Sequence, residues 1–202
     1  MTIFDRAGRT LQALPLVCRY PRGFRIPSHL TLAERAVLYR LAEGVPHRPV
    51  LEIGSYLGAS AYFLAAARDR AEYGGRVICI DTWQNDAMTE GARDTFAQFL
   101  ANTRAFTGRI TPLRGFSHEV VKAARALAPE GIGMLFIDGD HSWESVRRDW
   151  DCYRHLLGPG AVVALHDIGW AEGVQRVVRE EVEPLVDESG ALPNLWWGTM
   201  AR

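Results

Sequence analysis

Acidic side chains and histidines lie within or directly after several apolar stretches of this chain. They are Glu52, Asp81, Asp138, His141, His166 and Asp167. Carboxylate oxygens and imidazole nitrogens can hold a divalent metal ion, and an imidazole can also accept a proton near neutral pH. Acids can equally bind the hydroxyl or ammonium groups of a small ligand. These residue types therefore indicate polar ligand binding and proton transfer, provided that the fold brings them together.

The segment Val50–Ser60, with the sequence VLEIGSYLGAS, predicts a strand, a glycine turn and the start of a helix. Such a turn brings backbone N–H groups up to a small ligand. A dinucleotide-binding turn needs G-x-G-x-x-G. Here Gly54 and Gly58 are four residues apart, and Tyr56 stands in place of the middle glycine. Glu52 would repel a phosphate and suits an ammonium group instead.

A further acid, Asp81, ends the next apolar stretch, where its carboxylate could bind two ribose hydroxyls. A nucleoside joined to an amino acid, without phosphate, describes S-adenosylmethionine. We therefore predict that this cofactor binds at the glycine turn and at Asp81. The predicted contacts in this part of the chain are Glu52, Gly54, Ser55, Tyr56, Gly58, Ser60, Asp81 and Trp83.

The composition is that of a soluble single-domain protein. The chain has 202 residues, of which 48% are hydrophobic and 23% charged, and its formal net charge is −1. This near-neutral balance argues against nucleic acid as a partner, and no apolar stretch is long enough to span a membrane. The three cysteines lack a C-x-x-C spacing, which favours reduced thiols and a cytoplasmic location.

Residues 1–30 differ from the rest of the chain in their charge, with five arginines against one aspartate. We interpret them as an N-terminal arm. The arm is either solvated, or a lid or patch for an anionic partner. Residues 31–202 then form the main domain.

The hydrophobic pattern predicts apolar strands that alternate with helices. The predicted strands are 50–53, 77–81, 110–114, 134–137, 161–165 and 195–200. The predicted helices are 32–43, 59–68, 90–106, a helix that Ser117 caps and that ends at Leu127, 142–156 and 172–186. The first five strands are continuous apolar runs, which predicts an α/β fold with a parallel sheet covered on both faces.

The candidate acids and histidines all fall at the carboxyl ends of these strands, where ligands of parallel sheets bind. Trp83 and Trp170 also follow strand ends and are candidates for contact with cofactor or substrate. Each polar residue has a simpler alternative, because Asp138 and Asp167 could cap helices and His141 could be a packed ring. Their convergence on one rim favours a functional site.

The chain resembles class I S-adenosylmethionine-dependent O-methyltransferases that use a metal ion. Its loop from Glu52 to Ala61 is similar to the cofactor loop of catechol O-methyltransferase. The stretch Ile137–Gly169 looks closer to a branch that contains macrocin-type sugar O-methyltransferases and cephalosporin hydroxylase-like proteins. The resemblance implies a single-domain Rossmann-like fold over residues 31–202, in which the mostly parallel sheet ends in an antiparallel strand. Only one strand of the usual terminal hairpin, 195–200, is evident.

The resemblance also implies roles for individual residues. Asp81 matches the ribose-binding acid, while Ser117, His118 and Asp138 match further cofactor contacts. Asp138 and Asp167 match metal-binding positions, and His141 matches the general base. The third protein ligand differs, because His166 precedes the second aspartate and Ile168 follows it, where relatives have a glutamate or an asparagine. Mg²⁺ suits the two carboxylates, and a ligating His166 would favour Mn²⁺ or another transition metal.

The favoured hypothesis is a divalent-metal-dependent O-methyltransferase that acts on a hydroxyl of a sugar or of a sugar-containing metabolite. Its substrate would be a small molecule or an oligosaccharide, and a homo-oligomer stays open. One alternative is a metal-independent N- or carboxyl methyltransferase. Others are a nucleotide-binding oxidoreductase, which Tyr56 in the loop disfavours, and a non-catalytic binding module on the same fold.

Overall fold

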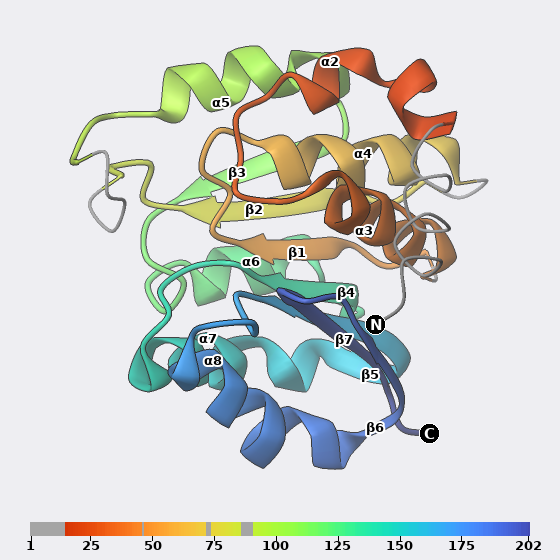
Figure 1. Ribbon diagram of the computed structural model, residues 1–202, viewed down its shortest axis with the longest axis vertical. Helices are drawn as coiled ribbons and strands as arrows, with labels where there is room; N and C mark the ends of the chain where they lie inside the picture. Colours follow the sequence, from red (N-terminus) through yellow and green to blue (C-terminus); the bar gives the residue numbers. More distant parts are fainter. Residues whose placement is uncertain (1–14, 46, 72–73, 86–90) are drawn as a thin grey trace.

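The computed structural model describes residues 15–45, 47–71, 74–85 and 91–202. Its strands form one sheet with the order β3-β2-β1-β4-β5-β7-β6 (Figure 1). They are β1 (Val50–Ile53), β2 (Val77–Asp81), β3 (Ile110–Arg114), β4 (Ile132–Ile137), β5 (Leu157–His166), β6 (Val186–Ala191) and β7 (Leu195–Met200). Strands β1 to β5 pair in parallel, whereas β7 is antiparallel to β5 and β6. This confirms the predicted α/β fold with a mostly parallel sheet.

Helices cover both faces of the sheet, as the continuous apolar strands predict. Figure 1 shows α2 to α5 on one face and α6 to α8 on the other. They are α2 (Pro21–Phe24), α3 (Leu32–Gly44), α4 (Ala59–Arg70), α5 (Phe96–Thr103), α6 (Val121–Leu127), α7 (Trp143–Tyr153) and α8 (Glu172–Val177). Short 3₁₀ turns, η1 (Arg104–Phe106) and η2 (Arg154–Leu156), extend α5 and α7, while η3 (Val178–Val182, a π-helix) and η4 (Glu183–Leu185) follow α8. None of the helices in the described ranges is long and apolar enough to cross a membrane.

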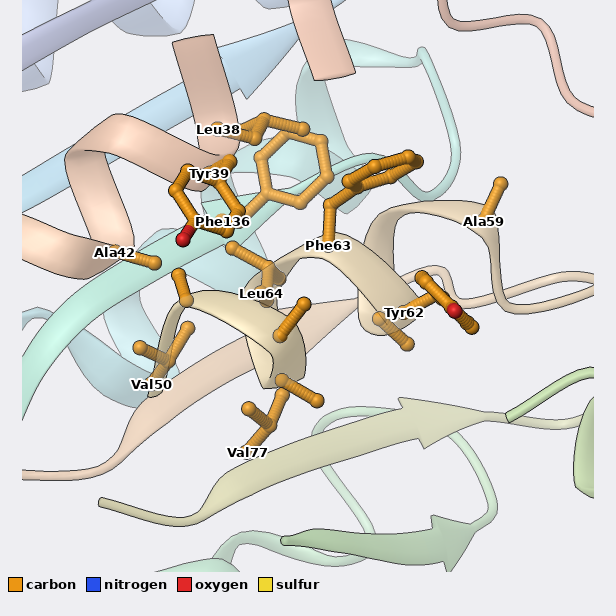
Figure 2. Packing of buried hydrophobic residues seen from close by; sticks show 14 of the residues in the cluster. Leu38, Tyr39, Ala42, Val50, Ala59, Tyr62, Phe63, Leu64, Val77 and Phe136 are labelled. Carbon is orange, nitrogen blue, oxygen red and sulfur yellow. The ribbon is translucent and has the colours of Figure 1, made fainter. Parts of the chain in front are cut away.

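The helix that follows the glycine turn, α4, lies in the centre of one face. All of its residues from Ala59 to Arg68 are buried, because the sheet covers one side of this helix and α3 packs on another. Figure 2 shows Phe63 and Leu64 of α4 together with Leu38 of α3 and Val50 of β1, all members of one hydrophobic cluster. A helix buried in this way is fixed in position, and so is the loop at its N-terminus.

The sheet order reverses between β1 and β4. The chain runs outward from β1 to β3 on one side and from β4 to β5 on the other. After β1 it enters α4 on one face, and after β4 it enters α7 on the opposite face. Ligands of open α/β sheets bind at this kind of reversal, beyond the carboxyl ends of the two strands.

The sequence analysis missed strand β6. Its sequence, VDESGA, is polar, and most of its residues are exposed because it lies at the edge of the sheet and pairs only with β7. Charged edge strands resist pairing with other chains, and they carry no apolar pattern that would identify them. The carboxyl end is therefore an antiparallel pair, and not the single strand that was evident from the sequence.

Two helices begin later than predicted. Helix α5 starts at Phe96 instead of near Glu90, which lies outside the described residues. The segment before it pairs with other backbone, since the N–H of Arg93 donates to the carbonyl of Gln84 at 2.8 Å. Helix α6 starts at Val121, because the Ser117 hydroxyl that was expected to cap it is buried and bonded to another side chain.

Strand β5 begins four residues before the predicted strand 161–165, because residues 157–160 are extended as well. Leu157 pairs with Ile132 of β4 before a shift in register. The two glycines and the proline in this segment are typical of a turn, whereas the neighbouring strand holds the segment extended.

The described part of the predicted N-terminal arm, from residue 15 onward, packs on the main domain. Leu16, Ile26 and Leu30 are buried in the cluster that contains α4. The buried guanidinium of Arg35 donates to the carbonyl oxygens of Leu30, Gly23 and Phe24. The first fourteen residues lie outside the described ranges, so a lid in that segment stays a prediction.

Candidate active site

The loop after β1 is held against the end of β4. Gly54 has a φ of +86°, and a Cβ built there would lie 2.0 Å from the carbonyl oxygen of Asp138. Gly58 is the N-cap of α4 with a φ of +87°, and its Cβ would lie 2.6 Å from Cγ2 of Thr103. Only glycine fits both the left-handed backbone and such close contacts. The predicted strand, glycine turn and helix are all present.

Gly54→Ala is expected to lower the Tm and to weaken the binding of S-adenosylhomocysteine. The added Cβ would meet backbone atoms of the β4 loop, which cannot rotate away as a side chain can. Gly160→Ala is the matched control, because Gly160 has a φ of +76° with nothing within 4 Å of a Cβ. Left-handed backbone alone costs alanine about 1–2 kcal/mol. Thermal unfolding and calorimetry should show the larger loss at Gly54, and equal effects at both glycines would contradict this reading.

The carboxylate of Asp81 fixes the backbone of the same loop. Its Oδ2 accepts hydrogen bonds from the N–H groups of Ser55 and Tyr56 at 2.9 and 2.8 Å. Its Oδ1 accepts one from the N–H of Trp83 at 2.6 Å. Each carboxylate oxygen has two acceptor positions, so Oδ1 keeps one for a ribose hydroxyl. The structure joins Asp81 to the loop, and ribose binding by Asp81 stays a prediction.

Glu52 lies in β1, two residues before Gly54, and is fully buried. Its Oε2 accepts a hydrogen bond from the hydroxyl of Ser55 at 2.5 Å, and its Oε1 has no partner among the described residues. Burial raises the pKa of Glu52 to about 7, although hydrogen bonds from Ser55, Ser60 and Cys79 act in the opposite direction. In this structure Glu52 supports the loop from beneath, and its predicted contact with an ammonium group stays a prediction.

Trp83 also supports the loop from the interior. Its ring is buried beside Phe96 and Phe99, with ring centroids 4.8 and 4.7 Å apart. Its indole N–H donates to the carbonyl of Tyr56 at 3.0 Å. The structure therefore places Trp83 behind the glycine turn and does not expose its ring as a surface for stacking.

The segment after β3, which was predicted to contact the cofactor, is fixed by two residues of α7. The buried hydroxyl of Ser117 donates to the carboxylate of Asp149, and the hydroxyl of Tyr153 donates to the carbonyl of Ser117 at 2.7 Å. Burial raises the pKa of Asp149 to about 6. His118 is exposed and stacks on Phe116, with ring centroids 5.7 Å apart. Ser117 thus anchors this segment, and His118 is the exposed member of the predicted pair.

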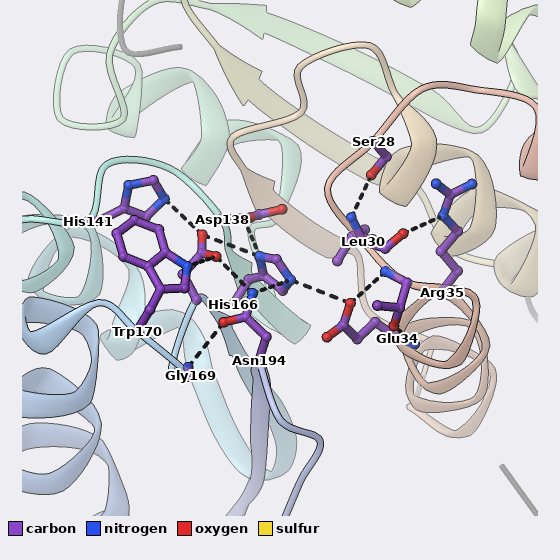
Figure 3. Close-up of polar contacts among 12 residues, drawn as sticks. Ser28, Leu30, Glu34, Arg35, Asp138, His141, His166, Gly169, Trp170 and Asn194 are labelled. Carbon is purple, nitrogen blue, oxygen red and sulfur yellow. Dashed lines mark hydrogen bonds and ion pairs between the residues drawn. The ribbon is translucent and has the colours of Figure 1, made fainter. Parts of the chain in front are cut away.

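The ends of β4 and β5 bring together the predicted metal ligands. Ligand atoms of Asp138, His166 and Asp167 all lie within 4.8 Å of one another. Figure 3 shows the His166 ring beside Asp138 at the centre of this group. Nδ1 of His166 lies 3.0 Å from Oδ1 of Asp138 and 3.3 Å from Oδ2 of Asp167, but neither contact has hydrogen-bond geometry. A buried nitrogen directed between two carboxylates fits a metal ligand.

The other nitrogen of His166, Nε2, faces Glu34 in the first turn of α3. It lies 3.6 Å from Oε2 of Glu34, which also accepts a 2.6 Å hydrogen bond from the N–H of Thr31. Burial alone would lower the pKa of His166, but Asp138, Asp167 and Glu34 raise it to about 12. A carboxylate behind the outer nitrogen is the usual arrangement for a histidine that binds a metal. An ion must displace the proton from Nδ1 before this ring can bind it.

Asp167 is the most heavily bonded side chain of the group. Its Oδ1 accepts hydrogen bonds from Nε1 of Trp170 at 2.8 Å and from Nδ2 of Asn194 at 2.9 Å. Its Oδ2 pairs with His141, which leaves one acceptor position on that oxygen near His166. These contacts hold the pKa of Asp167 well below its ordinary value, although burial acts in the opposite direction. Asp167 is therefore an ionised carboxylate in a fixed orientation.

His141 lies at the solvent side of this cluster. Its Nε2 is 2.8 Å from Oδ2 of Asp167, and its ring centroid is 4.7 Å from that of Trp170 (Figure 3). The hydrogen bond to Asp167 raises the pKa of His141, whereas partial burial acts to lower it. With Nε2 directed at Asp167, Nδ1 is the nitrogen that can accept a proton from a ligand.

Three residues of the site were not among the sequence predictions. Glu34 forms a capping box with Thr31 at the start of α3. Asn194 lies just before β7, and its amide bonds both Asp167 and the N–H of Gly169. Asp149 lies on α7. Nothing local in the sequence relates these positions to the site, because the packing of distant elements creates each contact.

Comparison with known proteins gives the family. A family model described as "Methyltransferase domain" matches residues 51–168, which is more than half of the chain. The chain belongs to this family. The match begins in β1 and ends directly after Asp167, so it includes the glycine turn, Asp81 and the cluster at the ends of β4 and β5.

One curated relative of this methyltransferase is the uncharacterized protein y4gI of Sinorhizobium fredii (strain NBRC 101917 / NGR234). The two sequences are 22% identical over 128 residues, which is 63% of this chain. The chain spans only 14% of the length of that relative. Activities of the longer protein therefore do not transfer to this chain.

Solved O-methyltransferase structures share the fold of this methyltransferase. CalS11, a TDP-rhamnose 3′-O-methyltransferase of calicheamicin biosynthesis, has a TM-score of 0.61 at 21% identity and covers 82% of this chain and 77% of its own. A Bacillus cereus O-methyltransferase in complex with S-adenosylhomocysteine has a TM-score of 0.66 at 17% identity. The match covers 94% of this chain and 90% of that enzyme. MycE of the mycinamycin pathway was solved with Mg, S-adenosylhomocysteine and mycinamycin VI. Its TM-score is 0.60 at 14% identity, and the match covers 91% of this chain and 52% of MycE.

Proposed function

We propose that this methyltransferase transfers the methyl group of S-adenosylmethionine to a hydroxyl of a sugar or sugar-containing metabolite, with a divalent metal ion in the site. The observation that carries the proposal is the cluster at the ends of β4 and β5. There, His141 contacts Asp167 at 2.8 Å, and Asp138 and His166 complete a set of metal-ligating atoms. This cluster lies beside the loop after β1, because Gly54 packs against the carbonyl of Asp138.

The chemistry requires a stronger nucleophile and not a more reactive methyl group, since the sulfonium of the cofactor already activates the methyl. The oxygen of the acceptor attacks the methyl carbon, the carbon–sulfur bond breaks, and the bond electrons stay on sulfur. The hydroxyl proton goes to Nδ1 of His141. Asp167 holds the ring through Nε2 and stabilises the imidazolium that forms, as the acid of a catalytic triad does.

Asp138, Asp167 and His166 would hold the metal ion. When bound, the ion would stabilise the negative charge that develops on the acceptor oxygen and orient neighbouring hydroxyls. Two carboxylates suit Mg²⁺, and the nitrogen of His166 makes the set equally suited to Mn²⁺. Glu34 behind His166 would orient the ring as a ligand.

The sugar preference is supported by one protein of the same fold. CalS11 is described as a TDP-rhamnose 3′-O-methyltransferase. S-Adenosylhomocysteine in the Bacillus cereus enzyme and in MycE supports the predicted cofactor. The cytoplasmic location and the homo-oligomer, which was left open, stay predictions from the sequence.

A metal-independent N- or carboxyl methyltransferase is the second candidate. One observation favours it, namely that His166 lies among Glu34, Asp138 and Asp167, where a protonated imidazole would offset the charge of these acids. In that case Asp138 and Asp167 would hold a permanent imidazolium in place of an ion. The two candidates differ in their response to chelator.

Removal of metal is expected to suppress turnover. Excess EDTA should reduce methyl transfer to TDP-rhamnose or another accepted sugar to the background rate, and Mg²⁺ or Mn²⁺ should restore it. Because the ion competes with a proton on His166, the metal concentration needed for half-maximal rate should fall as the pH rises. Full activity in excess EDTA at every pH would favour the metal-independent candidate.

A further inference from the structure

Trp170 is an exposed aromatic residue beside the catalytic cluster. With 62% of its surface accessible, it is the most exposed large hydrophobic residue in the described part of the chain. It lies in the loop after β5, three residues beyond Asp167. Figure 3 shows its indole next to the imidazole of His141. An exposed apolar ring beside a polar site indicates that a ligand covers it during function.

The indole is exposed but not free to rotate. Its Nε1–H donates to Oδ1 of Asp167 at 2.8 Å, so its polar edge points into the cluster. The backbone carbonyl of Asp167 accepts hydrogen bonds from the N–H groups of Trp170 at 3.3 Å and Ala171 at 2.9 Å, which closes a tight turn. The side chain of Ala171 is buried and anchors that turn. An aromatic surface that is already oriented loses little conformational entropy when a ligand covers it.

The distance between the rings of Trp170 and His141 limits the size of a ligand that can contact both. The two ring centroids are 4.7 Å apart with planes inclined at 58°, so the imidazole and the indole are in contact. A single ring stacked on the indole, at the usual separation of about 4.5–7 Å, would reach His141 with its own rim. A substituent on that rim would then lie near Nδ1, the nitrogen assigned to accept the proton.

The carboxylates around His141 determine which charge a ring stacked on Trp170 can carry. Asp138, Asp140 and Asp167 all act electrostatically on His141, the ring that contacts the indole. Asp140 is exposed and is not one of the residues that would hold the metal ion, so its charge would not be taken up by the ion and would repel a carboxylate or phosphate on the stacked ring. A neutral ring with several hydroxyls avoids that repulsion and offers hydrogen-bond partners to the acids.

We propose that Trp170 is the acceptor platform of this enzyme. The apolar carbon face of a neutral pyranose stacks on the exposed indole, and the hydroxyl to be methylated then points at His141. This inference rests on the proposed sugar O-methylation and specifies which residue recognises the sugar. A uronic acid, which carries a carboxylate on the same ring, is predicted to be rejected.

The test measures binding and turnover with defined probes. TDP-rhamnose is the neutral-sugar probe, UDP-glucuronic acid the acidic one, and catechol the flat aromatic one, each with S-adenosylhomocysteine and Mg²⁺ present. Saturation-transfer NMR reports which protons of a probe touch the protein, and steady-state kinetics with S-adenosylmethionine give the KM of each substrate. Leu185→Ala is the matched control, because it truncates another exposed apolar side chain, 39% accessible, in η4.

For Trp170→Ala the expected result is a rise of about 10-fold or more in the KM for TDP-rhamnose, with an unchanged KM for S-adenosylmethionine and an unchanged Tm. The ring protons of rhamnose should show transfer in the native protein and in Leu185→Ala, and should lose it in Trp170→Ala. Trp170→Phe separates stacking from the bond to Asp167, because phenylalanine keeps an aromatic face and lacks the N–H. Near-native KM in Trp170→Phe supports the platform.

Three results would overturn the inference. One is an unchanged sugar KM in Trp170→Ala while the native protein methylates the sugar, which would leave the proposed function intact. Another is equal loss in Trp170→Phe and Trp170→Ala, which would assign the effect to the hydrogen bond. The third is methylation or binding of catechol or UDP-glucuronic acid in preference to TDP-rhamnose, which would refute the sugar assignment together with the platform.

Discussion

Replacing His141 with glutamine is expected to slow methyl transfer by about 10²–10⁴-fold, the usual contribution of general acid–base catalysis. Glutamine can still reach Asp167 with its amide, but it cannot take up the proton from the acceptor hydroxyl. The affinity for S-adenosylhomocysteine should stay unchanged, because no hydrogen bond, ion pair or ring contact among the described residues joins His141 to the loop after β1. Single-turnover rates and calorimetry check the two halves of this prediction.

The pH profile gives a second measure of the same residue. Its hydrogen bond to Asp167 raises the pKa of His141 above 6.5. A base must be unprotonated to act, so kcat/KM should rise with pH through this raised pKa and level off above it. In His141→Gln this rising limb should disappear, and the small residual rate should show no dependence on an imidazole.

His155→Gln is the matched control for the loss of an imidazole. His155 is an exposed histidine of η2 that contacts Arg125, and it has no part in the proposed chemistry. It should leave both the rate and the pH profile as they are in the native protein. Near-normal turnover of the accepted sugar by His141→Gln would place the base elsewhere, and His166 would be the first alternative.

Replacing Asp81 with alanine is expected to weaken S-adenosylhomocysteine binding by about 100-fold or more. Three backbone N–H groups, those of Ser55, Tyr56 and Trp83, lose their common acceptor. Hydrogen bonds to a charged group contribute about 1.5–3 kcal/mol each, and about 1.4 kcal/mol corresponds to tenfold in affinity. The loop would lose its shape in addition to any direct contact with ribose.

Calorimetry with Asp81→Asn separates these two contributions. Asparagine keeps one oxygen that can accept from Ser55 and Tyr56, so the loop should retain most of its shape. Asp187→Ala is the control, since this exposed acid of β6 also accepts a backbone N–H, from Arg202 at 3.3 Å. Cofactor affinity in Asp81→Ala equal to that of the control would remove Asp81 from the site.

The parts of the site that the sequence predicts are those encoded within a few residues. The turn from Glu52 to Ser60 and the pairs at Asp138 and Asp167 follow from apolar strands that end in polar residues. Strand order then brings them together, because parallel strands all present their carboxyl ends on one side of the sheet. A buried strand such as Ile132–Ile137 carries its own signal, whereas the polar edge strand Val186–Ala191 does not.

The contacts that the sequence does not predict are those between distant elements. Trp83 is a good stacking residue by type, yet packing against Phe96 and Phe99 buries it behind the loop. Ser117 is a good helix cap by type, yet Asp149 takes its hydroxyl. In each case a tertiary contact overrides the local preference of the residue, and the partner lies more than ten residues away along the chain.

The position of Asn194 has a consequence for when the protein becomes active. Its amide reaches Asp167 from the turn before β7, while Glu34 reaches His166 from the opposite end of the described chain. A ribosome that has made the family-matched core, residues 51–168, has therefore not yet supplied the donor that steadies Asp167. On a nascent chain the acid would stay loosely held until β7 had emerged and paired with β5. We therefore expect methyl transfer to reach its full rate only after β7 has paired and Asn194 holds Asp167.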